Sequence, residues 1–338
     1  MARASLLFAI AMRNRNAAER CCSYVAILEH AAASGSELRD LATYLSTLGV
    51  ANCDVIILDA SPRLQFELNG RILRWVGRHV AVRPEFRTPG GATDITRAAA
   101  ALAACEKVIV AADDVRYTPE AIGQLCDLLD AHEVVEPQDY LEPLPWWGGI
   151  DAGRILVHRG IEPQPDHGAT YAFRRSTVRA MRALGSSEVY DDQVRRLAAV
   201  GAEVHAATDV FVRRQPAPLG DWLSARPRLA GDDFALPMKT AFFFSLMPML
   251  LLLAAAGGLR LAGGYAGVIA MATIGLALRG RAGAAAFFPL RAALFAPLWV
   301  FERSVSVYWA LYRKLCGVEA DPLRVAIPDA RERVASGE

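Results

Sequence analysis

The sequence predicts an α/β protein in which a Rossmann-like, mostly parallel sheet is followed by apolar helices that cross or lie on a membrane. Two observations support this fold class. Up to about residue 210, short apolar segments alternate with segments of helical spacing, which is typical of a parallel sheet covered on both faces. After about residue 240 the hydrophobic residues gather into long uncharged stretches; the whole chain is 53% hydrophobic, with a mean hydropathy of +0.22.

The first part of the chain contains four predicted strands and three predicted helices. Residues 5–12 (SLLFAIAM) suit a first buried strand. A signal peptide is disfavoured there, because Arg13 and Arg15 follow at once and no small-residue cleavage site is present. The other strands are predicted over residues 53–61, 79–84 and 107–114, and the helices over residues 16–32, 93–106 and 119–131. Parallel sheets bind ligands at the carboxyl ends of their strands.

The composition of the chain changes near residue 134. Residues 134–149 (VVEPQDYLEPLPWWGG) are rich in proline and tryptophan, which excludes a regular helix through this stretch. The elements predicted after it are a strand over 168–176, a helix over 176–184, a helix that starts near Asp191 and Asp192 and ends at Gly201, and a short strand.

Two stretches without a charged residue, 240–259 and 261–278, are long enough to cross a bilayer, which takes roughly 20 apolar residues. The next stretch, 284–315, is interrupted by prolines and charges and suits an interfacial or re-entrant helix. We therefore expect a domain over residues 1–236, a membrane region over 237–316 and a polar tail over 317–338. The alternative for the two uncharged stretches is a hairpin of buried core helices.

The charges around these stretches predict an orientation. Lys239 precedes the first stretch and Arg279 and Arg281 follow the second, whereas only Arg260 lies between them. By the positive-inside rule, both ends of the hairpin and the N-terminal domain face the cytoplasm. A multi-pass protein of the cell membrane (inner or plasma), with a cytoplasmic domain, is expected.

Net charge and cysteine usage narrow the class of partner. The formal net charge is +1 and no basic stripe is interleaved with aromatic residues, so nucleic acid is not an expected partner. The six cysteines form no CxxC pair and have no metal-site spacing. Buried, reduced thiols are therefore expected.

Acidic residues stand where two predicted strands end. Asp59 ends one strand, and the adjacent Asp113 and Asp114 end another. Asp59 alone could cap a turn, and the pair could form a solvated turn. The functional interpretation is a divalent cation, because hard cations such as Mg²⁺ take one or two carboxylates plus phosphate oxygens. Such a cation would neutralise the charge that grows on a leaving diphosphate.

A second acidic pair and a group of arginines follow. Asp191 and Asp192 begin a predicted helix; one of them would take a proton from an acceptor hydroxyl, and the alternative is a helix N-cap with an acidic first turn. The arginines that precede the membrane region are Arg213, Arg214, Arg226 and Arg228. They would contact lipid headgroups or clamp a phosphate.

In the order of these features, residues 5–235 and the helices after them resemble a membrane-bound family 2 glycosyltransferase of the GT-A fold. ADDVRY (112–117) is similar to the family's DDDVRY stretch, with Ala112 in place of the first aspartate. HGATYAFRRS (167–176) resembles the strand that closes the donor-sugar pocket, and YDDQ (190–193) resembles the family's acidic pair before a helix. The family's QxxRW motif is absent, and SARPRLAGDDFALP (224–237) occupies its place.

The resemblance implies a role for each candidate residue. Asp59 would contact the nucleotide base, Asp114 would hold Mg²⁺ or Mn²⁺, and Asp113 would lie beside the donor. Asp191 or Asp192 would be the catalytic base, with Asp191 favoured because it takes the first position of the pair. The remaining donor contacts implied are Gly168, Ala169 and Thr170, with Arg226 and Arg228 as substitutes for the missing motif.

The expected function is an inverting glycosyltransferase of the hexosyltransferase type. It would move a sugar from a nucleotide-sugar donor to a lipid or lipid-linked acceptor at the bilayer. The alternative is a catalytically impaired, membrane-tethered nucleotide-sugar-binding relative that acts as an assembly partner, because Ala112 and the missing motif alter the site. A transporter or structural membrane protein is a second alternative, disfavoured because the two apolar stretches carry no charge.

Overall fold

A computed structural model gives the structure of the protein. It describes residues 22–28, 35–50, 53–87, 93–162, 170–180, 190–199, 201–232, 234 and 237–316. The chain divides into two compact units: unit 1 is Met1–Glu142 with Gln164–Gln215, and unit 2 is Pro143–Pro163 with Pro216–Glu338. This division differs from the predicted boundary at residue 236. The helices α6 (Trp146–Ile161) and α9 (Leu219–Asp232) pack with the C-terminal helices and therefore belong to unit 2.

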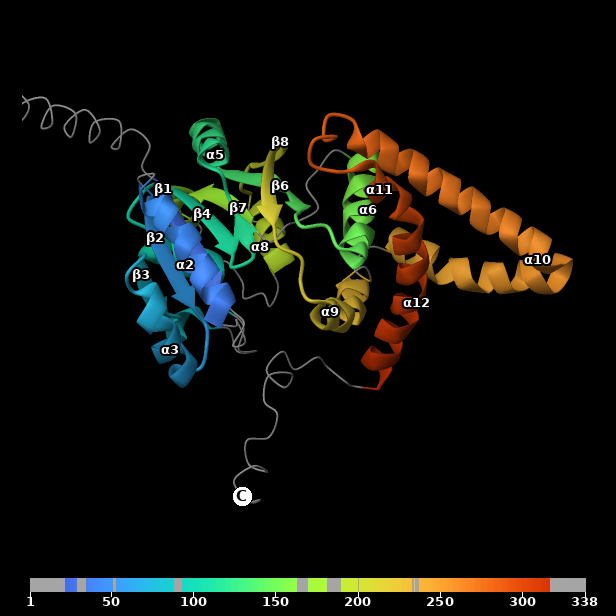
Figure 1. Cartoon of the computed structure of the whole chain (residues 1–338), viewed down its shortest axis with the longest axis horizontal. Coiled ribbons are helices and arrows are strands. Elements are labelled where there is room, and N and C mark those ends of the chain that lie inside the picture. Colours follow the sequence, from blue (N-terminus) through green and yellow to red (C-terminus); the bar gives the residue numbers. More distant parts are fainter. Residues whose placement is uncertain are drawn as a thin grey trace, which may run out of the picture. The chain divides into compact units, whose positions relative to one another are not determined.

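The described part of unit 1 contains an eight-stranded mixed sheet in the order β3-β2-β1-β4-β7-β6-β8-β5 (Figure 1). Its strands are β1 (Cys22–Leu28), β2 (Cys53–Asp59), β3 (Arg78–Ala81), β4 (Lys107–Ala112), β5 (Val115–Arg116), β6 (Val134–Leu141), β7 (Thr170–Arg174) and β8 (Val204–Arg214). The four strands β1, β2, β3 and β4 all run parallel to one another, and β6 runs parallel to β8. β7 is antiparallel to β4 and β6, and β5 is antiparallel to β8. The α/β class is confirmed, with a sheet that is mixed in its second half.

Helices cover both faces of this sheet, as the continuously apolar strand segments of the sequence predicted. They are α2 (Gly35–Val50), α3 (Arg63–Leu73), the 3₁₀ helix η1 (Pro84–Phe86), α4 (Ile95–Leu102), α5 (Pro119–Ala131), α7 (Arg175–Ala180) and α8 (Tyr190–Ala199). Neighbouring side chains of a strand point to opposite faces. Tyr24 of β1 accordingly packs in a core cluster with residues of α2 and α5, while Val25 packs in a second cluster with residues of α4, α7 and α8.

The predicted helix over residues 16–32 is wrong where the structure describes it, because Cys22–Leu28 is the central strand β1. All seven residues (CSYVAIL) are buried. A strand buried on both faces is apolar throughout, so its pattern resembles that of a buried helix, and the aromatic and β-branched residues in it favour the strand. The strand predicted over 5–12 lies outside the described residues.

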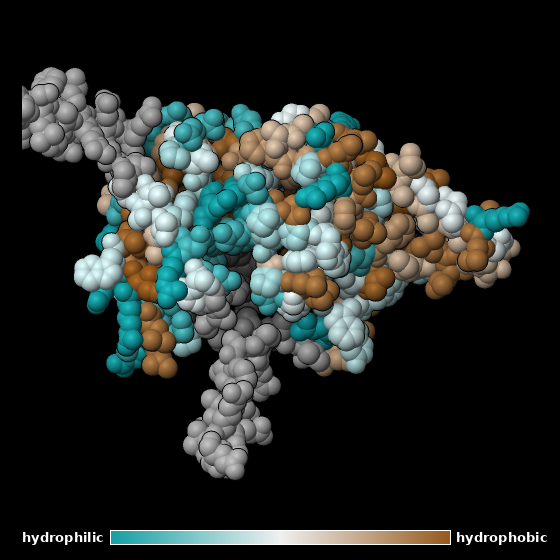
Figure 2. Space-filling model, viewed as in Figure 1, coloured by the Kyte–Doolittle hydropathy of each residue, from teal (hydrophilic) through white to brown (hydrophobic). Residues whose placement is uncertain are grey.

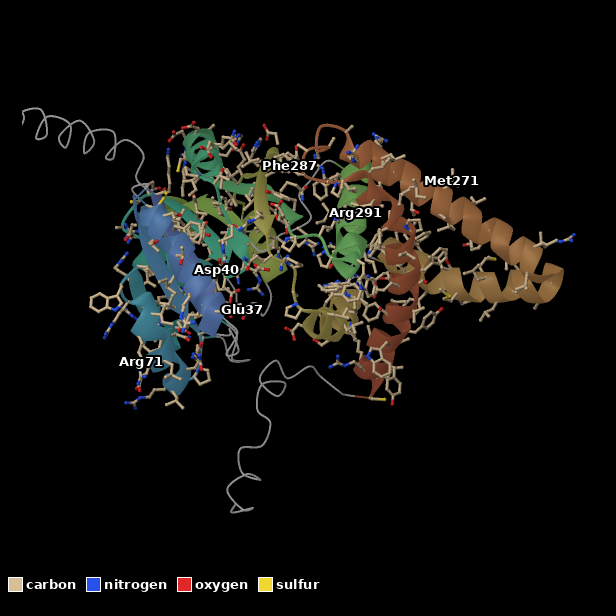
Figure 3. The ribbon with its side chains drawn as sticks, viewed as in Figure 1. Glu37, Asp40, Arg71, Met271, Phe287 and Arg291 are labelled. Carbon is tan, nitrogen blue, oxygen red and sulfur yellow. The ribbon has the colours of Figure 1, made fainter. Side chains whose placement is uncertain are left out.

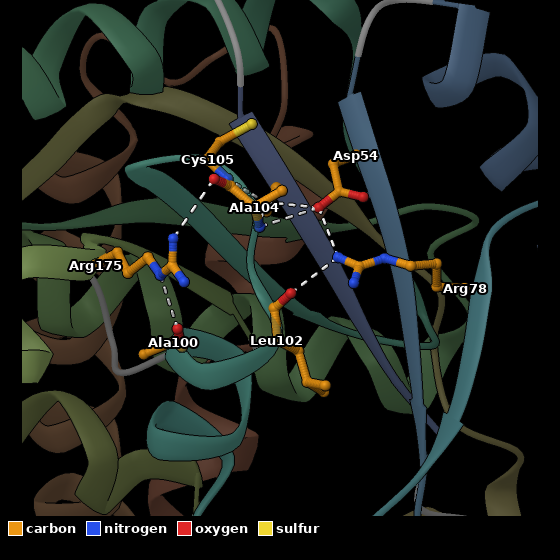
Figure 4. A network of polar contacts seen from close by, with 8 residues as sticks. Asp54, Arg78, Ala100, Leu102, Ala104, Cys105 and Arg175 are labelled. Carbon is orange, nitrogen blue, oxygen red and sulfur yellow. Dashed lines mark hydrogen bonds and ion pairs between the residues drawn. The ribbon is translucent and has the colours of Figure 1, made fainter.

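Polar contacts tie strands β1, β2 and β3 to the segment that follows α4 (Figure 4). Arg78 donates to Asp54 Oδ2 (2.8 Å) and to the carbonyl oxygen of Leu102 (2.9 Å). The amide of Cys105 donates to Ser23 Oγ (3.1 Å). Among the described cysteines, Cys22, Cys53 and Cys126 are buried free thiols, as expected, and Cys316 is free but exposed. Cys105 is disulfide-bonded, so the expectation of a reduced thiol is wrong there.

Unit 2 is helical in its described part, with α10 (Pro237–Arg281), α11 (Leu290–Leu294) and α12 (Ala296–Leu315) beside α6 and α9. α10 turns at Gly258, whose φ of 70° is non-helical, and folds back on itself (Figure 1). Among the described residues, Met238–Arg281 has the length and apolar composition of a membrane span, with a hydropathy of 2.1 in its most apolar window. The space-filling view shows apolar side chains gathered over α10 (Figure 2).

Glycines allow α6 and the second half of α10 to touch backbone to backbone. A Cβ added at Gly280 would lie 1.9 Å from the carbonyl oxygen of Leu156, and one added at Gly160 would lie 2.1 Å from that of Leu276. Both distances are far shorter than any real contact, so a methyl group at either position forces the helices apart. The absence of a side chain at this crossing sets the separation of the two helices.

We predict that Gly280→Ala destabilises unit 2 by about 1–3 kcal/mol, the usual penalty for overpacking. Gly275→Ala is the matched control in the same helix, because nothing lies within 4 Å of an added Cβ there. The measurement is the midpoint of thermal unfolding of the full chain in detergent. Equal midpoints for the two variants would show that the helices do not pack at this distance.

Candidate functional site

The sheet brings the predicted donor-site residues of unit 1 to one edge. Asp59 ends β2 beside Leu28, the last residue of β1, and Ala112 ends β4 beside Ile27. Because β7 runs antiparallel to β4, its first residue Thr170 pairs with Ala111 at the same edge. The carboxyl ends of β2 and β4 therefore lie in line with the start of β7.

Asp59 is 1% exposed, and both oxygens of its carboxylate accept hydrogen bonds from the protein. Oδ1 accepts from the amide of Ser61 (2.8 Å), and Oδ2 accepts from Asn69 Nδ2 (3.0 Å) and contacts His79 Nε2 (2.8 Å). Burial by itself raises the pKa of Asp59, but the hydrogen bonds from His79, Ser61 and Asn69 outweigh it, and the net pKa is lowered. The imidazole of His79 in turn stacks on Phe66, with ring centroids 4.3 Å apart.

The predicted contact of Asp59 with a nucleotide base stays a prediction. In the structure the side chain of Asp59 has no exposed surface. Asp59 shapes the strand end through Asn69 and His79, two residues that the sequence pattern did not reveal.

The turn after β4 holds Asp113 and Asp114, and β8 contributes a cation to it. Asp114 Oδ2 pairs with Arg214 Nε (2.7 Å), and Arg214 Nη1 lies 3.5 Å from Asp139 Oδ2. The other oxygen, Asp114 Oδ1, is buried and has no hydrogen-bond partner among the described residues. A buried carboxylate oxygen without a donor is unusual and suits a metal ion as its partner.

The residues at this turn suit a divalent cation for which the protein supplies only some of the ligands. Within the described ranges no group of three or more His, Cys, Asp or Glu side chains could hold a metal. Mg²⁺ is commonly bound by one or two carboxylates together with substrate phosphates and water. Asp114 Oδ1 would be a protein ligand in such a site.

A second ion pair involves Arg116 of β5, the strand that directly follows this turn. Arg116 Nη2 pairs with Asp40 Oδ2 (3.0 Å), and Asp40 projects from α2 (Figure 3). Gln215 Nε2 also donates to Asp40 Oδ2 (3.3 Å), and the Gln215 amide donates to the carbonyl oxygen of Asp114 (2.9 Å). The hydrogen bond from Arg116 is the main reason that the pKa of Asp40 is lowered. The end of β8 is thus fastened to the turn by side chain and backbone.

Thr170 is fully buried at the start of β7. Its hydroxyl donates to the carbonyl oxygen of Val110 (2.6 Å) and therefore accepts from Tyr117 Oη (2.6 Å), since a hydroxyl has one proton. The side chain of Thr170 is used inside the protein, which leaves it no free donor for a ligand. Gly168 and Ala169, the other two predicted donor contacts here, lie outside the described residues.

The predicted base residues lie in the first turn of α8, which begins at Tyr190. The side chains of Asp191 and Asp192 are outside the described set. The next residue, Gln193, is 5% exposed and accepts a hydrogen bond from Thr96 of α4 (2.8 Å). The start of α8 is thereby attached to α4.

Arg226, a predicted donor contact, is paired with an acidic residue of its own unit. In unit 2 its guanidinium forms a bidentate ion pair with Asp151, with Nη1 and Nη2 at 2.8 and 3.1 Å from the two carboxylate oxygens. It also lies 4.1 Å from the ring of Trp222, whose Nε1 donates to the same carboxylate (2.7 Å). Burial alone raises the pKa of Asp151, but the charges of Arg226 and Arg154 lower it overall. Arg226 is 6% exposed and already paired; the side chain of Arg228 is not described.

No protein-family model matches the chain, and no curated protein does. Solved structures with a similar arrangement include a mannosyltransferase from Pyrobaculum calidifontis in complex with GDP-mannose and Mn²⁺. It is 14% identical, the match covers 86% of this chain and 87% of that one, and the TM-score is 0.47. Another is glucosyl-3-phosphoglycerate synthase from Mycobacterium tuberculosis with Mn²⁺, UDP and glucosyl-3-phosphoglycerate, at 19% identity, 63% and 78% coverage and a TM-score of 0.39. These values are too low to transfer a residue's role to this chain.

We predict that Asp59→Asn lowers the stability of unit 1 at neutral pH by roughly 1–3 kcal/mol, because buried hydrogen bonds to the carboxylate are lost. A carboxylate whose pKa is lowered by folding stabilises the protein above its unfolded pKa, and this stability is lost as the pH falls through the folded pKa. The difference between wild type and variant should therefore shrink on acidification. Unfolding midpoints from pH 7 to pH 3 test this, with the exposed Asp127→Asn as control; a difference that grows would contradict it.

We predict that Arg226→Gln acts on stability and leaves donor binding unchanged. Removing one partner of a buried ion pair leaves an uncompensated charge and costs about 3–5 kcal/mol. The midpoint of thermal unfolding should fall clearly, while the affinity for nucleoside diphosphate stays within twofold of wild type. A stable variant with weakened nucleotide binding would contradict this and support the predicted donor contact of Arg226.

Proposed function

We propose that the protein is an inverting glycosyltransferase that moves a sugar from a nucleotide-sugar donor to a lipid or lipid-linked acceptor. The observation that carries this proposal is the sheet edge described above. It brings the Asp113–Asp114 turn beside the start of β7, and at that turn a buried carboxylate oxygen lacks a described donor. The motif order in the sequence supports the same reaction.

In the proposed reaction the chain's own residues divide the work. Asp114 would hold a divalent cation, Mg²⁺ or Mn²⁺, whose charge stabilises the leaving diphosphate. Asp113 would lie beside the donor, and Asp59 would keep the end of β2 in shape through His79 and Asn69.

Asp191 or Asp192 would take the proton of the acceptor hydroxyl. The acceptor oxygen forms a bond to the anomeric carbon while the bond to the diphosphate breaks. One displacement of this kind inverts the anomeric configuration.

The C-terminal helices support a membrane-associated acceptor. Met238–Arg281 is apolar, and 11% of its most apolar window is buried within the protein. We propose that it forms a membrane hairpin around Gly258, with Arg260 at its turn. The basic residues at the hairpin ends, Lys239, Arg279 and Arg281, favour a cell-membrane protein whose catalytic domain faces the cytoplasm. In this proposal α11 and α12 lie at the interface between membrane and water.

A second candidate function is a catalytically impaired nucleotide-sugar binder that acts as an assembly partner. Two observations favour it. Ala112 stands where the resembling family has its first aspartate, and Arg214 pairs with Asp114 Oδ2, so one of the two remaining carboxylates already has a cationic partner. Such a protein would bind donor and cation without transferring the sugar.

The deciding experiment incubates membranes that contain the full chain with a panel of nucleotide sugars and Mn²⁺, followed by analysis of the lipid extract. We predict that the double variant Asp191→Asn with Asp192→Asn lowers transfer by about 10²–10⁴-fold, the usual contribution of a general base. Its affinity for nucleoside diphosphate should stay within twofold of wild type. Glu120→Gln, on the exposed start of α5, is the matched control.

Each outcome separates the candidates. Transfer by wild type that survives the double change contradicts the base assignment. Wild type that binds nucleotide sugar with Mn²⁺ but transfers nothing favours the assembly partner. Asp114→Asn should weaken Mn²⁺-dependent nucleotide binding in both cases, and unchanged binding would remove Asp114 from the metal site.

A further inference from the structure

A buried chain of hydrogen bonds joins β7, α4 and α8 within unit 1. Tyr171 Oη and Thr96 Oγ1 are 2.8 Å apart, and Thr96 Oγ1 and Gln193 Oε1 are also 2.8 Å apart. Tyr171 and Thr96 are fully buried, and Gln193 is 5% exposed. Each residue belongs to a different element. Gln193 follows the proposed base residues, and Tyr171 follows Thr170, a donor contact predicted from the sequence.

The direction of this chain follows from its donors and acceptors. An amide oxygen only accepts, so the Thr96 hydroxyl donates its single proton to Gln193. Thr96 can then only accept from Tyr171, whose phenol is the donor. In this arrangement Thr96 takes part in both hydrogen bonds, so a change of its rotamer breaks both of them.

The two ends of the chain lie beside the proposed site. Tyr171 follows Thr170 at the start of β7, at the edge where β4 ends. Gln193 follows Asp191 and Asp192 in the first turn of α8. Thr96 lies between them in the first turn of α4, a helix that Asp94 caps by accepting from the amide of Arg97 (3.1 Å).

Apolar packing alone leaves the rotation of α8 weakly defined. Val194 and Leu197 are buried in the same core cluster as Ile95 and Ala99 of α4. Apolar contacts of this kind are non-directional, so they define the rotation of a helix less sharply than a hydrogen bond does. A buried hydrogen bond to the first turn is directional and fixes which way that turn faces.

We infer that Tyr171, Thr96 and Gln193 position the first turn of α8. They hold this turn, and with it the proposed catalytic base, at a fixed distance from β7, the strand that begins beside the proposed site of the nucleotide-sugar donor. This inference rests on the proposed function for its catalytic consequence. A general base must lie within hydrogen-bond reach of the acceptor proton, and a displacement of about 1 Å can lower the rate 10²-fold. The three residues act through Asp191 or Asp192 and do not themselves touch the substrate.

The test compares Thr96→Val, which keeps the shape but removes both hydrogen bonds, with Thr96→Ser, which keeps the hydroxyl. Thr96→Val should lower kcat for sugar transfer about tenfold and leave the donor KM within twofold, and Thr96→Ser should recover most of the loss. Thr177→Val, at a buried threonine of α7, is the matched control and should behave as wild type. An unchanged kcat in Thr96→Val, a change confined to KM, or a Thr96→Ser variant no better than Thr96→Val would overturn the inference.

Amide hydrogen exchange tests the same hydrogen-bond chain without any turnover. In Thr96→Val, residues 190–199 should exchange at least threefold faster than in wild type, while residues 119–131 of α5 keep their rate. This readout stands even if wild type transfers no sugar, an outcome that would count against the proposed function alone. Unchanged exchange over 190–199 would show that the hydrogen-bond chain does not hold α8.

Discussion

The antiparallel insertion of β7 between β4 and β6 is the constraint on which the candidate site depends. Strands that run parallel to β1 bring only their carboxyl ends to the site edge. Because β7 runs the other way, the pairing of Ala111 with Thr170 sets its first residue beside the end of β4. A slip of one residue would exchange the faces of β7 and remove Tyr171 from the core cluster that it shares with α4 and α8.

Buried charge is balanced locally in both units, and this explains much of the polar structure. Asp59 is held by Ser61, Asn69 and His79, and Asp151 is held by Arg226 and Trp222. A buried carboxylate is tolerated only when its oxygens have partners. Asp114 departs from this pattern, because only one of its oxygens is paired among the described residues.

The spacing of apolar and polar residues within a single segment was enough to predict β2, β4 and α5. It was wrong for β1, where a run of buried residues suits either a strand or a helix. It missed α2, although Leu38, Leu41, Leu45 and Leu48 recur there at helical spacing and are buried. The partners of the acidic residues could not be predicted, because Asp59 meets His79 across 20 residues and Asp114 meets Arg214 across 100. Such contacts arise only when the sheet assembles.

Ala112 and Arg214 both reduce the negative charge of the turn after β4. In the resembling family three acidic residues stand here, whereas this chain has two carboxylates and a guanidinium that neutralises part of their charge. Fewer negative charges attract a divalent cation less strongly, but they also repel a diphosphate less. Arg214 pairs with both Asp114 and Asp139, so two carboxylates hold it at the turn. In the proposed reaction a guanidinium at this position would stabilise a diphosphate alongside the cation, without an acidic residue at position 112.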